Sequence, residues 1–331
     1  MKISRSLVAR LISSDIVQRL MTQQFLSFDN SGFSMWQQCC TKGFINTGLR
    51  RVSARGQTPL LFGGAVHEGL AARLAGASDR EAIDIALATA TKSGLDDHLD
   101  EKRNRRTLAD LLGSYFIHCD CTGDWIRPVL IDGVAVVEKG FEFELSKLEL
   151  TGLKYLPNGF YSLNWKGKLD VLERYQGDLW ILDHKTTSIM GEKFIDDKLR
   201  SSQMLGYAWA GSFFASAFGE TIQGVRINAL ATRSKGFEFK QFPIPYTPQA
   251  VLDWRDETIV ALTQFLRWLD GILASCGEAP YIEFTPNRDA CVTKYGRCAY
   301  FDACNSLPVM LERILFDDAQ YIANVWDPLM E

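Results

Sequence analysis

The sequence contains no run of eighteen or more apolar residues, although 47% of its 331 residues are hydrophobic. A helix that crosses a membrane needs about twenty such residues, so the sequence offers no candidate membrane span. The formal net charge is only −4. DNA contact needs a local basic stripe rather than a basic total. The densest basic run, residues 103–106, is more typical of a solvated surface than of a phosphate track.

Internal repeats, low-complexity segments and a phosphate-binding loop of the pattern G-x-x-x-x-G-K-[ST] are also missing. The missing loop excludes a motor of the P-loop class within this sequence. The amphipathic segment 1–26 carries early basic residues, but Asp15 and its apolar periodicity favour a docking helix over a transit peptide. With charged residues at 23%, composition is that of an ordinary globular protein. We therefore expect a cytoplasmic enzyme.

Two apolar runs that end in charged residues are the most informative part of the sequence. The first run leads to Asp170, and the second leads to Asp183, His184 and Lys185. Residues 176–178, Gln-Gly-Asp, are typical of a turn, so the two runs are expected to form a β-hairpin. Such a hairpin would set the two aspartates near one another, with Lys185 on the same strand face as Asp183.

Two carboxylates held close together are unfavourable without a cation between them, and oxygen ligands suit Mg²⁺ or Mn²⁺. A lysine beside such a metal can position or activate water for attack on a phosphodiester. A surface hairpin with a salt-bridged Asp–Lys pair is the alternative for the hairpin alone. Two helices favour the metal site. Gln203 and Tyr207 share one helix face at i,i+4, and His67 could reach a metal, although a single helical histidine is more often structural.

The remaining pattern predicts helices and strands in an order that is informative about the fold. Helices are expected at about residues 5–24, 34–49, 64–75, 79–119 with a break near 93–94, 198–218 and 248–274. Strands are expected at about residues 134–145, 161–175, 179–184, 224–233 and 237–244. The α-β-β-β-α-β order in the middle resembles the core expected of a restriction-endonuclease-like fold.

These residues, in this order, resemble the RecB-like branch of the PD-(D/E)xK nuclease superfamily over about residues 35–305. The matching elements are the helix with His67, the strand with Asp170, the Asp183-His184-Lys185 block and the helix with Gln203-x-x-x-Tyr207. The family pattern also has a glutamate on the strand before the hairpin. Glu138 fits that position, although Glu142 and Glu144 are close enough to compete with it.

The resemblance implies an α/β fold with a mixed sheet flanked by helices. Its expected parts are a helical lobe at 1–120, a nuclease core at 121–285, and a Cys-rich loop with a C-terminal helix at 286–331. The implied metal ligands for Mg²⁺ or Mn²⁺ are His67, Asp170, Asp183 and the His184 main-chain carbonyl, with Glu138 as a further candidate. The other implied catalytic residues are Lys185, Gln203 and Tyr207.

The implied function is a metal-dependent DNA exonuclease that acts on single-stranded DNA or DNA ends. Phage recombination, repair or CRISPR adaptation would be its setting, with a helicase or recombination protein as partner. The alternative is a non-catalytic module that grips DNA ends. Intact Asp170, Asp183 and Lys185 argue against that alternative, because loss of activity usually removes the metal ligands first.

Eight cysteines provide an independent signal. No secretory leader is apparent, so we do not expect a disulfide framework. Cys291, Cys298 and Cys304 form a C-x6-C-x5-C cluster, and the adjacent Cys39 and Cys40 lie far upstream. A Cys₄ zinc site or buried apolar cysteines are the alternatives, but the paired C-x₂₋₄-C knuckles typical of zinc are missing.

One distant cysteine with a C-terminal trio resembles the iron–sulfur staple of AddB and the CRISPR-adaptation exonucleases, in the same nuclease branch. It implies a [4Fe–4S] cluster held by Cys40, Cys291, Cys298 and Cys304. Cys40 is favoured over Cys39 because Phe44 keeps the aromatic spacing of the family motif, although the proline of that motif is absent. The cluster would order the loop at 286–305, which has little apolar surface of its own.

Overall fold

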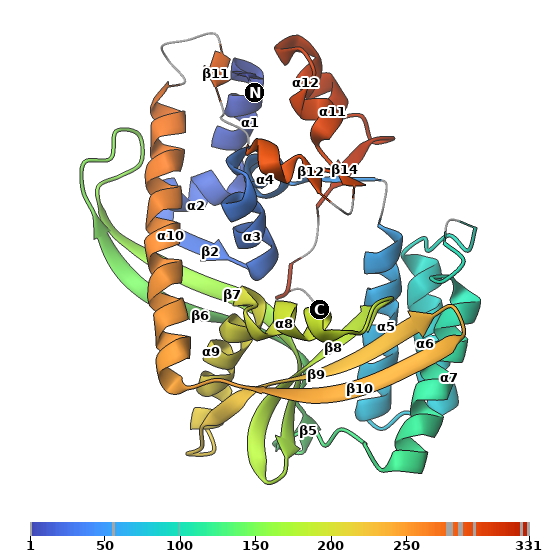
Figure 1. The fold of residues 1–331 in the computed structure, drawn as a ribbon. Coiled ribbons are helices and arrows are strands. Elements are labelled where there is room, and N and C mark those ends of the chain that lie inside the picture. Colours follow the sequence, from blue (N-terminus) through green and yellow to red (C-terminus); the bar gives the residue numbers. More distant parts are fainter. Residues whose placement is uncertain are drawn as a thin grey trace. The chain divides into compact units, whose positions relative to one another are not determined.

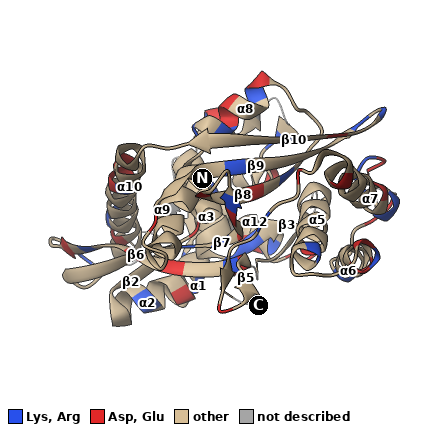
Figure 2. Cartoon of the chain, turned by 90° about the horizontal axis from the view of Figure 1, so that it is seen from below, with Lys and Arg blue, Asp and Glu red and all other residues tan. Residues whose placement is uncertain are grey.

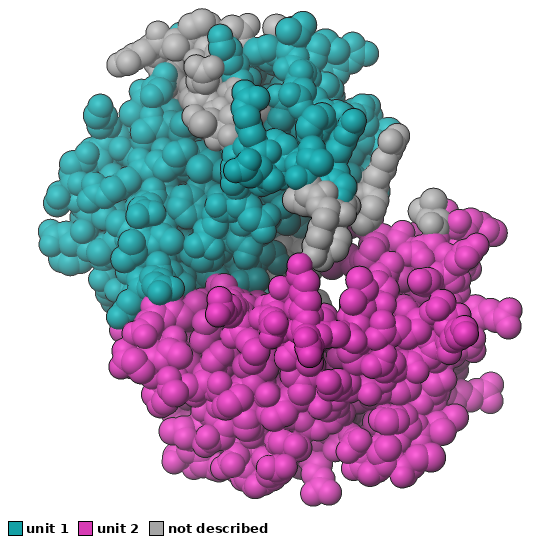
Figure 3. Space-filling view, in the orientation of Figure 1, with its two compact units in different colours: residues 1–56, 142–167, 256–331 teal, residues 57–141, 168–255 magenta. Residues whose placement is uncertain are grey.

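A computed structural model describes residues 2–54, 57–98, 100–275, 281–283, 287–293, 296–324 and 327–329. Its contacts divide the chain into two compact units, each built from segments far apart in the sequence (Figure 3). Unit 1 comprises residues 1–56, 142–167 and 256–331, and unit 2 comprises residues 57–141 and 168–255. These units interleave along the chain, whereas the parts expected from the sequence follow chain order.

Unit 2 combines a group of helices with an antiparallel–parallel–antiparallel sheet of order β10-β9-β8-β7 (Figure 1). Its helices are α5 (Thr58–Leu74), α6 (Asp79–Lys92), α7 (Arg105–Thr122), α8 (Glu192–Leu199) and α9 (Ser202–Ser216). Its complete strands are β4 (Leu130–Ile131), β5 (Val134–Ala135), β8 (Asp178–Thr187), β9 (Ile222–Arg233) and β10 (Gly236–Pro245). Three elements contribute residues to both units: β6 (Val137–Leu150), β7 (Gly159–Tyr175) and α10 (Pro248–Ala274).

The predicted hairpin is confirmed in β7 and β8, which pair from Tyr175↔Asp178 to Val171↔Leu182. Gln176 and Gly177 form the turn with φ angles of 53° and 96°. Positive φ at both central residues is typical of a type I′ turn, whose twist matches that of the strands. The turn therefore fixes the register of the hairpin and the positions of the charged residues at its open end.

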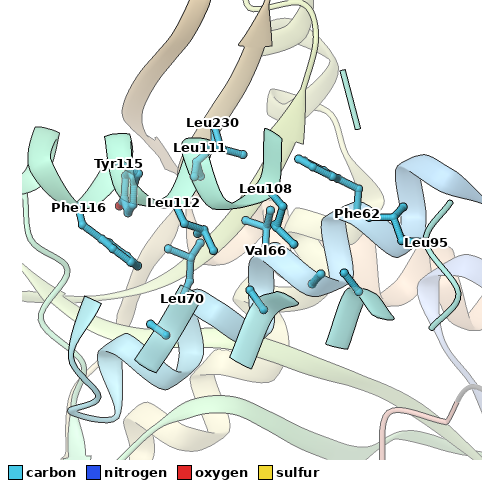
Figure 4. Packing of buried hydrophobic residues seen from close by; sticks show 14 of the residues in the cluster. Phe62, Val66, Leu70, Leu95, Leu108, Leu111, Leu112, Tyr115, Phe116 and Leu230 are labelled. Carbon is cyan, nitrogen blue, oxygen red and sulfur yellow. The ribbon is translucent and has the colours of Figure 1, made fainter. Parts of the chain in front are cut away.

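Helices α5, α6 and α7 pack together and against β9 (Figure 4). Leu70 of α5, Leu112 and Phe116 of α7 and Leu230 of β9 lie in one buried cluster. On α6 the buried side chains are alanines at i,i+4 spacing, which lets the neighbouring helices approach closely. This core holds α5, and hence His67, in place. Outside the core, both signs of charge lie on α6 and α7 (Figure 2).

Helix α9 packs closely on β8. A Cβ atom at Gly211 would lie 2.8 Å from the Ile181 side chain, so only glycine permits this approach. Because Gln203 and Tyr207 belong to the same helix, this contact also fixes their height above the strand. The single helix expected at 198–218 is in fact the end of α8 and the whole of α9, divided near Ser201.

Unit 1 contains short elements around an aromatic core. Its N-terminal elements are β1 (Lys2–Ser4), α1 (Arg5–Ile12), α2 (Asp15–Gln23), β2 (Phe25–Phe28), α3 (Asn30–Gln38), α4 (Cys40–Gly43), the π-helix η1 (Phe44–Gly48) and β3 (Arg51–Ser53). Its C-terminal elements are β11 (Tyr281–Glu283), the 3₁₀ helix η3 (Arg288–Ala290), β12 (Val292–Thr293), β13 (Gly296–Arg297), α11 (Phe301–Cys304), α12 (Pro308–Leu315) and β14 (Tyr321–Ala323). Edge-to-face contacts join Phe28, Phe33, Trp165 and Phe265.

Two expectations for this region were wrong. The helix expected at 5–24 is two helices, since α1 ends at Ile12 and Ser14 caps α2. The expected helix at 34–49 is also divided, into α3, α4 and η1. Strand β2, which the sequence did not suggest, pairs in parallel with the first half of β7. No helix within the described residues is long and apolar enough to span a bilayer.

Candidate active site

The open end of the β7–β8 hairpin holds two buried aspartates of unit 2. Val171 pairs with Leu182, so Asp170 and Asp183 follow next on the two strands. They are only 5% and 1% exposed. Asp170 Oδ2 accepts a hydrogen bond of 2.7 Å from the main-chain N–H of His184. The hairpin therefore fixes Asp170 through the backbone of the opposite strand.

His67, Glu138 and Asp170 form a group in which one ligand atom from each lies within 4.8 Å of the other two. His67 Nδ1 is 3.4 Å from Asp170 Oδ2 and 3.5 Å from Glu138 Oε1. The second ring nitrogen, Nε2, lies 3.0 Å from the main-chain oxygen of His184. A carbonyl at Nε2 holds the proton there and leaves Nδ1 toward the carboxylates, an arrangement typical of metal-binding histidines.

The charges of this group are strongly coupled. Burial alone would lower the pKa of His67, but Asp170 and Glu138 outweigh it and raise that pKa to about 10. Burial would raise the pKa of Asp170, but the nearby His67 and Lys185 hold it well below its usual range. Without a metal, the imidazolium helps to balance the charge of these carboxylates, a role that a divalent ion could take over.

Glu138 has an unusual backbone, with a φ of 49°. The left-handed region is strained for a residue with a long side chain, and such strain is often found at functional sites. The second carboxylate oxygen of Glu138, Oε2, forms a 2.8 Å ion pair with Nζ of Lys168, which lies two residues before Asp170 on β7. The sequence motif does not point to Lys168, although the period-2 alternation of a strand puts it on the Asp170 face.

The competing glutamates, Glu142 and Glu144, belong to unit 1 and have partners within it. Glu142 accepts a hydrogen bond from Asn164, and Glu144 accepts one from Ser162. Glu138 is therefore the glutamate that the structure brings to His67 and Asp170.

The partly buried Lys185 forms an ion pair with the buried Asp183, with Nζ 2.7 Å from Oδ1. Burial would lower the pKa of Lys185, but Asp183 and Asp170 outweigh it and raise it. Burial and the charge of Asp170 raise the pKa of Asp183, against the opposing effect of Lys185. The second oxygen of Asp183, Oδ2, is buried and has no hydrogen-bond partner within the described part of the chain. A cation is a partner that would satisfy it.

Gln203 and Tyr207 meet on α9 as the i,i+4 spacing predicts, and Gln203 Nε2 donates a 3.0 Å hydrogen bond to the Tyr207 hydroxyl. Burial and the charges of Asp183 and Asp170 raise the pKa of Tyr207 well above its usual value. The hydroxyl therefore stays protonated and lies within the electrostatic reach of both aspartates.

The structure brings some of the predicted metal ligands together and gives the others different partners. His67 and Asp170 lie together, with Glu138 as the third member of the group. Asp183 is engaged by Lys185, and the His184 carbonyl faces the His67 ring. The densest basic run is largely neutralised, since Arg103 pairs with Asp100 and Arg105 with Asp97.

The C-terminal cysteines and Cys39 lie in unit 1. Burial, together with the nearby Cys298, Cys39 and Cys291, raises the pKa of the Cys304 thiol to about 12. Cys298 and Cys39 likewise raise the pKa of the Cys291 thiol. The cysteine that raises the pKa of the Cys40 thiol is its neighbour Cys39. The structure thus brings Cys39 toward the trio. Part of the expected loop, residues 286, 294 and 295, lies outside the described residues.

An imidazole and two carboxylates around one point, with a partly buried lysine nearby, fit a hydrolase that uses a divalent metal. A family model described as the PD-(D/E)XK nuclease superfamily matches residues 34–305. The chain therefore belongs to that superfamily, and membership implies a metal-dependent nuclease that hydrolyses phosphodiester bonds of nucleic acid. A search of curated proteins found no match. The RecB-like and iron–sulfur branches stay predictions.

Proposed function

We propose that this nuclease is a DNA exonuclease that uses Mg²⁺ or Mn²⁺ and acts on single-stranded DNA or DNA ends. The observation that carries the proposal is the grouping of His67, Glu138 and Asp170 near the partly buried Asp183–Lys185 pair. The restriction to DNA and to ends is taken from the resemblance to RecB-like enzymes.

In this proposal, His67 Nδ1 and the carboxylates of Glu138 and Asp170 hold the metal, and Asp183 adds its unpaired Oδ2. Carboxylate oxygens suit both Mg²⁺ and Mn²⁺, whereas the imidazole nitrogen favours Mn²⁺. The His184 carbonyl lies 3.0 Å from His67 Nε2, so in this proposal it orients the imidazole and stays a predicted ligand of the metal. When bound, the metal would polarise a phosphoryl oxygen and acidify the attacking water.

Lys185 has a different role in this proposal. Its raised pKa keeps the side chain cationic at neutral pH, so it is suited to balance charge rather than to accept a proton. The ammonium, held by Asp183, would orient the attacking water and offset the negative charge that develops on the phosphoryl group. Gln203 and Tyr207 would orient the lysine or the scissile phosphate through their N–H and O–H groups.

The test uses DNA labelled at the 5′ or 3′ end, single- or double-stranded, with Mg²⁺ or Mn²⁺. Asp170→Asn should abolish cleavage while the protein stays folded. Asp270→Asn is a matched control, because Asp270 is also 5% exposed but accepts three main-chain N–H bonds in unit 1. It should lower stability and leave metal-dependent cleavage detectable.

Undiminished cleavage by the Asp170 variant would remove the metal-site assignment. DNA-end binding without cleavage under any metal would instead support the non-catalytic module. Internal cleavage of circular DNA would contradict the exonuclease assignment and leave the nuclease site intact.

We also propose a [4Fe–4S] cluster in unit 1, held by Cys291, Cys298, Cys304 and Cys39. Cys298, Cys39 and Cys291 all act electrostatically on the Cys304 thiol. These four thiols therefore supply the ligand set that a [4Fe–4S] cluster needs. Asn287 donates a 2.9 Å hydrogen bond to the Gln38 carbonyl, linking the two cysteine-bearing segments.

The sequence motif favoured Cys40, and this ligand can be decided directly. Protein purified without oxygen should be brown and contain about four irons per chain. Cys39→Ala should lose the iron and Cys40→Ala should keep it. The reverse result would restore Cys40 as the ligand, and colourless wild-type protein that stays folded and active would remove the cluster.

The biological setting belongs to the same proposal. The resemblance supports phage recombination, repair or CRISPR adaptation in the cytoplasm, with a helicase or recombination protein as partner. Co-purification of the tagged chain with such a protein on a DNA end would test it, and repeated purification of the nuclease alone on DNA ends would contradict it.

A further inference from the structure

A chain of buried side-chain hydrogen bonds lies behind the metal group in unit 2. Asn228 of β9 is directly opposite His184 of β8 in the parallel register. Its amide nitrogen is 2.9 Å from His184 Nδ1 and 2.9 Å from the hydroxyl oxygen of Tyr115 on α7. An amide nitrogen has two N–H groups and can only donate. It therefore donates one bond to the imidazole and one to the phenol.

His184 connects this chain to the metal group through its backbone. Its main-chain N–H donates to Asp170 Oδ2 at 2.7 Å, and its carbonyl oxygen is 3.0 Å from His67 Nε2. A rotation of the peptide planes at His184 would therefore move both contacts. The bond from Asn228 fixes the ring, and a fixed ring restricts these backbone rotations.

A buried asparagine at position 228 lowers the stability of the fold. The residue is 0% exposed in a strand whose neighbouring positions are apolar, and its Oδ1 has no hydrogen-bond partner within the described residues. A buried amide atom without a partner costs about 1–3 kcal/mol. An apolar residue of similar size would avoid that cost, so a role beyond packing is the better explanation of an asparagine here.

The series of side-chain hydrogen bonds continues beyond Tyr115, and these further bonds hold its far end in place. Gln241 Nε2 donates a 3.3 Å bond to the Tyr115 hydroxyl. Arg226 bonds to Gln241 and donates a 2.9 Å bond to Glu173, and both Arg226 and Glu173 are buried. A connected polar network of this kind holds its members in one arrangement. Tyr115 is thus a fixed support for Asn228.

We propose that Asn228 and Tyr115 are positioning residues of the nuclease: they hold His184 so that its backbone keeps Asp170 and His67 in a metal-binding geometry. The inference rests on the proposed metal site. Neither residue contacts the metal group directly. Outer partners that orient metal ligands typically change metal affinity by about 10- to 100-fold when they are removed.

The experiment measures Mn²⁺ binding by calorimetry on the full chain without DNA. Asn228→Leu should weaken Mn²⁺ binding by about 10-fold or more. The matched control is Asn46→Leu in unit 1, where a 5% exposed asparagine donates a 3.3 Å bond to the Tyr300 hydroxyl. The control loses a similar buried Asn–Tyr bond, so a similar loss of thermal stability and an unchanged Mn²⁺ affinity are expected.

A second pair of variants decides the question if Asn228→Leu does not fold. His184→Asn places an amide oxygen, bonded to Cγ as Nδ1 is, where it can accept the bond from Asn228, and it should bind Mn²⁺ within a few-fold of wild type. His184→Phe keeps a ring without an acceptor and should lose about 10-fold. Tyr115→Phe, which leaves the Asn228–His184 bond in place, should show a smaller loss.

The outcomes separate the two proposals. Wild-type protein that binds no Mn²⁺ would overturn the metal site and this inference together. Wild-type binding with an unchanged Asn228→Leu affinity would overturn the positioning role alone, and so would equal weakening by Asn46→Leu. Equal affinities of His184→Asn and His184→Phe would also contradict it.

Discussion

Metal affinity should depend steeply on pH, because a proton and the metal compete for His67. Nδ1 of His67 faces Asp170 and Glu138 at 3.4 and 3.5 Å. These carboxylates outweigh the effect of burial and raise the pKa of His67 to about 10. At neutral pH the ring is therefore protonated in the metal-free protein, and Nδ1 must lose its proton before it can bind a metal.

The sign and size of the effect follow from this competition. Below the raised pKa, each rise of one pH unit should strengthen Mn²⁺ binding about tenfold, or about 1.36 kcal/mol. From pH 6 to pH 9 the gain is about a thousandfold for one proton. With the ordinary pKa of 6.5, the affinity would level off above pH 7. Asp170, whose pKa is held well below its usual range, stays charged throughout.

The metal-free protein should show the opposite trend. Protonated His67 stabilises the folded state, since its pKa is higher there than in the unfolded chain. This contribution is complete below about pH 6.5 and is lost as the pH rises toward 10. Stability without metal should therefore decline over this window while metal affinity increases.

Calorimetry in two buffers with different ionisation enthalpies, at pH 6, 7, 8 and 9, would count the protons released. His67→Gln is the control, because its amide does not titrate. This variant should bind Mn²⁺ more weakly. Its log affinity should also rise with pH less steeply than that of wild type, by about one decade per pH unit. A flat wild-type profile, or the same slope in both proteins, would refute the competition.

Three further predictions concern the lysines and the core. Lys185→Ala should lower the cleavage rate by about 10²–10³ with little change in Mn²⁺ affinity, and a collapse of metal binding would show a structural lysine instead. Lys198→Ala should weaken DNA binding several-fold at constant Mn²⁺ affinity. Burial and then repulsion by Lys185 lower the pKa of Lys198, and an anionic phosphate would relieve that repulsion. Unchanged DNA binding in a gel-shift titration would place Lys198 outside the substrate path. Leu112→Ala should reduce the free energy of unfolding by about 2–5 kcal/mol in urea, because Leu112 is 0% exposed between helices, and a loss below about 1 kcal/mol would contradict that packing.

The hairpin could be predicted because its signals are local. Alternating strand faces determine that Lys185 meets Asp183, and residues 176 and 177 determine the turn. Helical spacing similarly predicted the Gln203–Tyr207 contact. In these cases the partners are neighbours in one element or across one turn.

Choices that depend on distant segments could not be predicted. Nothing local separates Glu138 from Glu142, since the choice depends on the left-handed backbone at Glu138 and on the position of α5. Likewise, Cys39 has an extended backbone, with φ at −165°, between α3 and α4. This break, rather than the motif, decides which of the two adjacent thiols lies near the C-terminal cysteines.

Asn228 gave no local signal either. It lies in a run that reads as an ordinary buried strand, and its partners come from α7 and β8. Strand β2 could not be predicted from local sequence either. Its four residues form a strand because they pair with β7, more than 130 residues later.

The interleaved units have a consequence for synthesis on the ribosome. Strand β3, at residues 51–53, pairs with β14, at residues 321–323. At about 5–20 residues per second, the second strand emerges roughly a quarter of a minute to a minute after the first. Unit 2 needs nothing beyond residue 255 and can be complete earlier. The nascent chain would thus hold a complete unit 2, with its candidate site, while the aromatic N-terminal segment of unit 1 still lacks the C-terminal strands that pair with it.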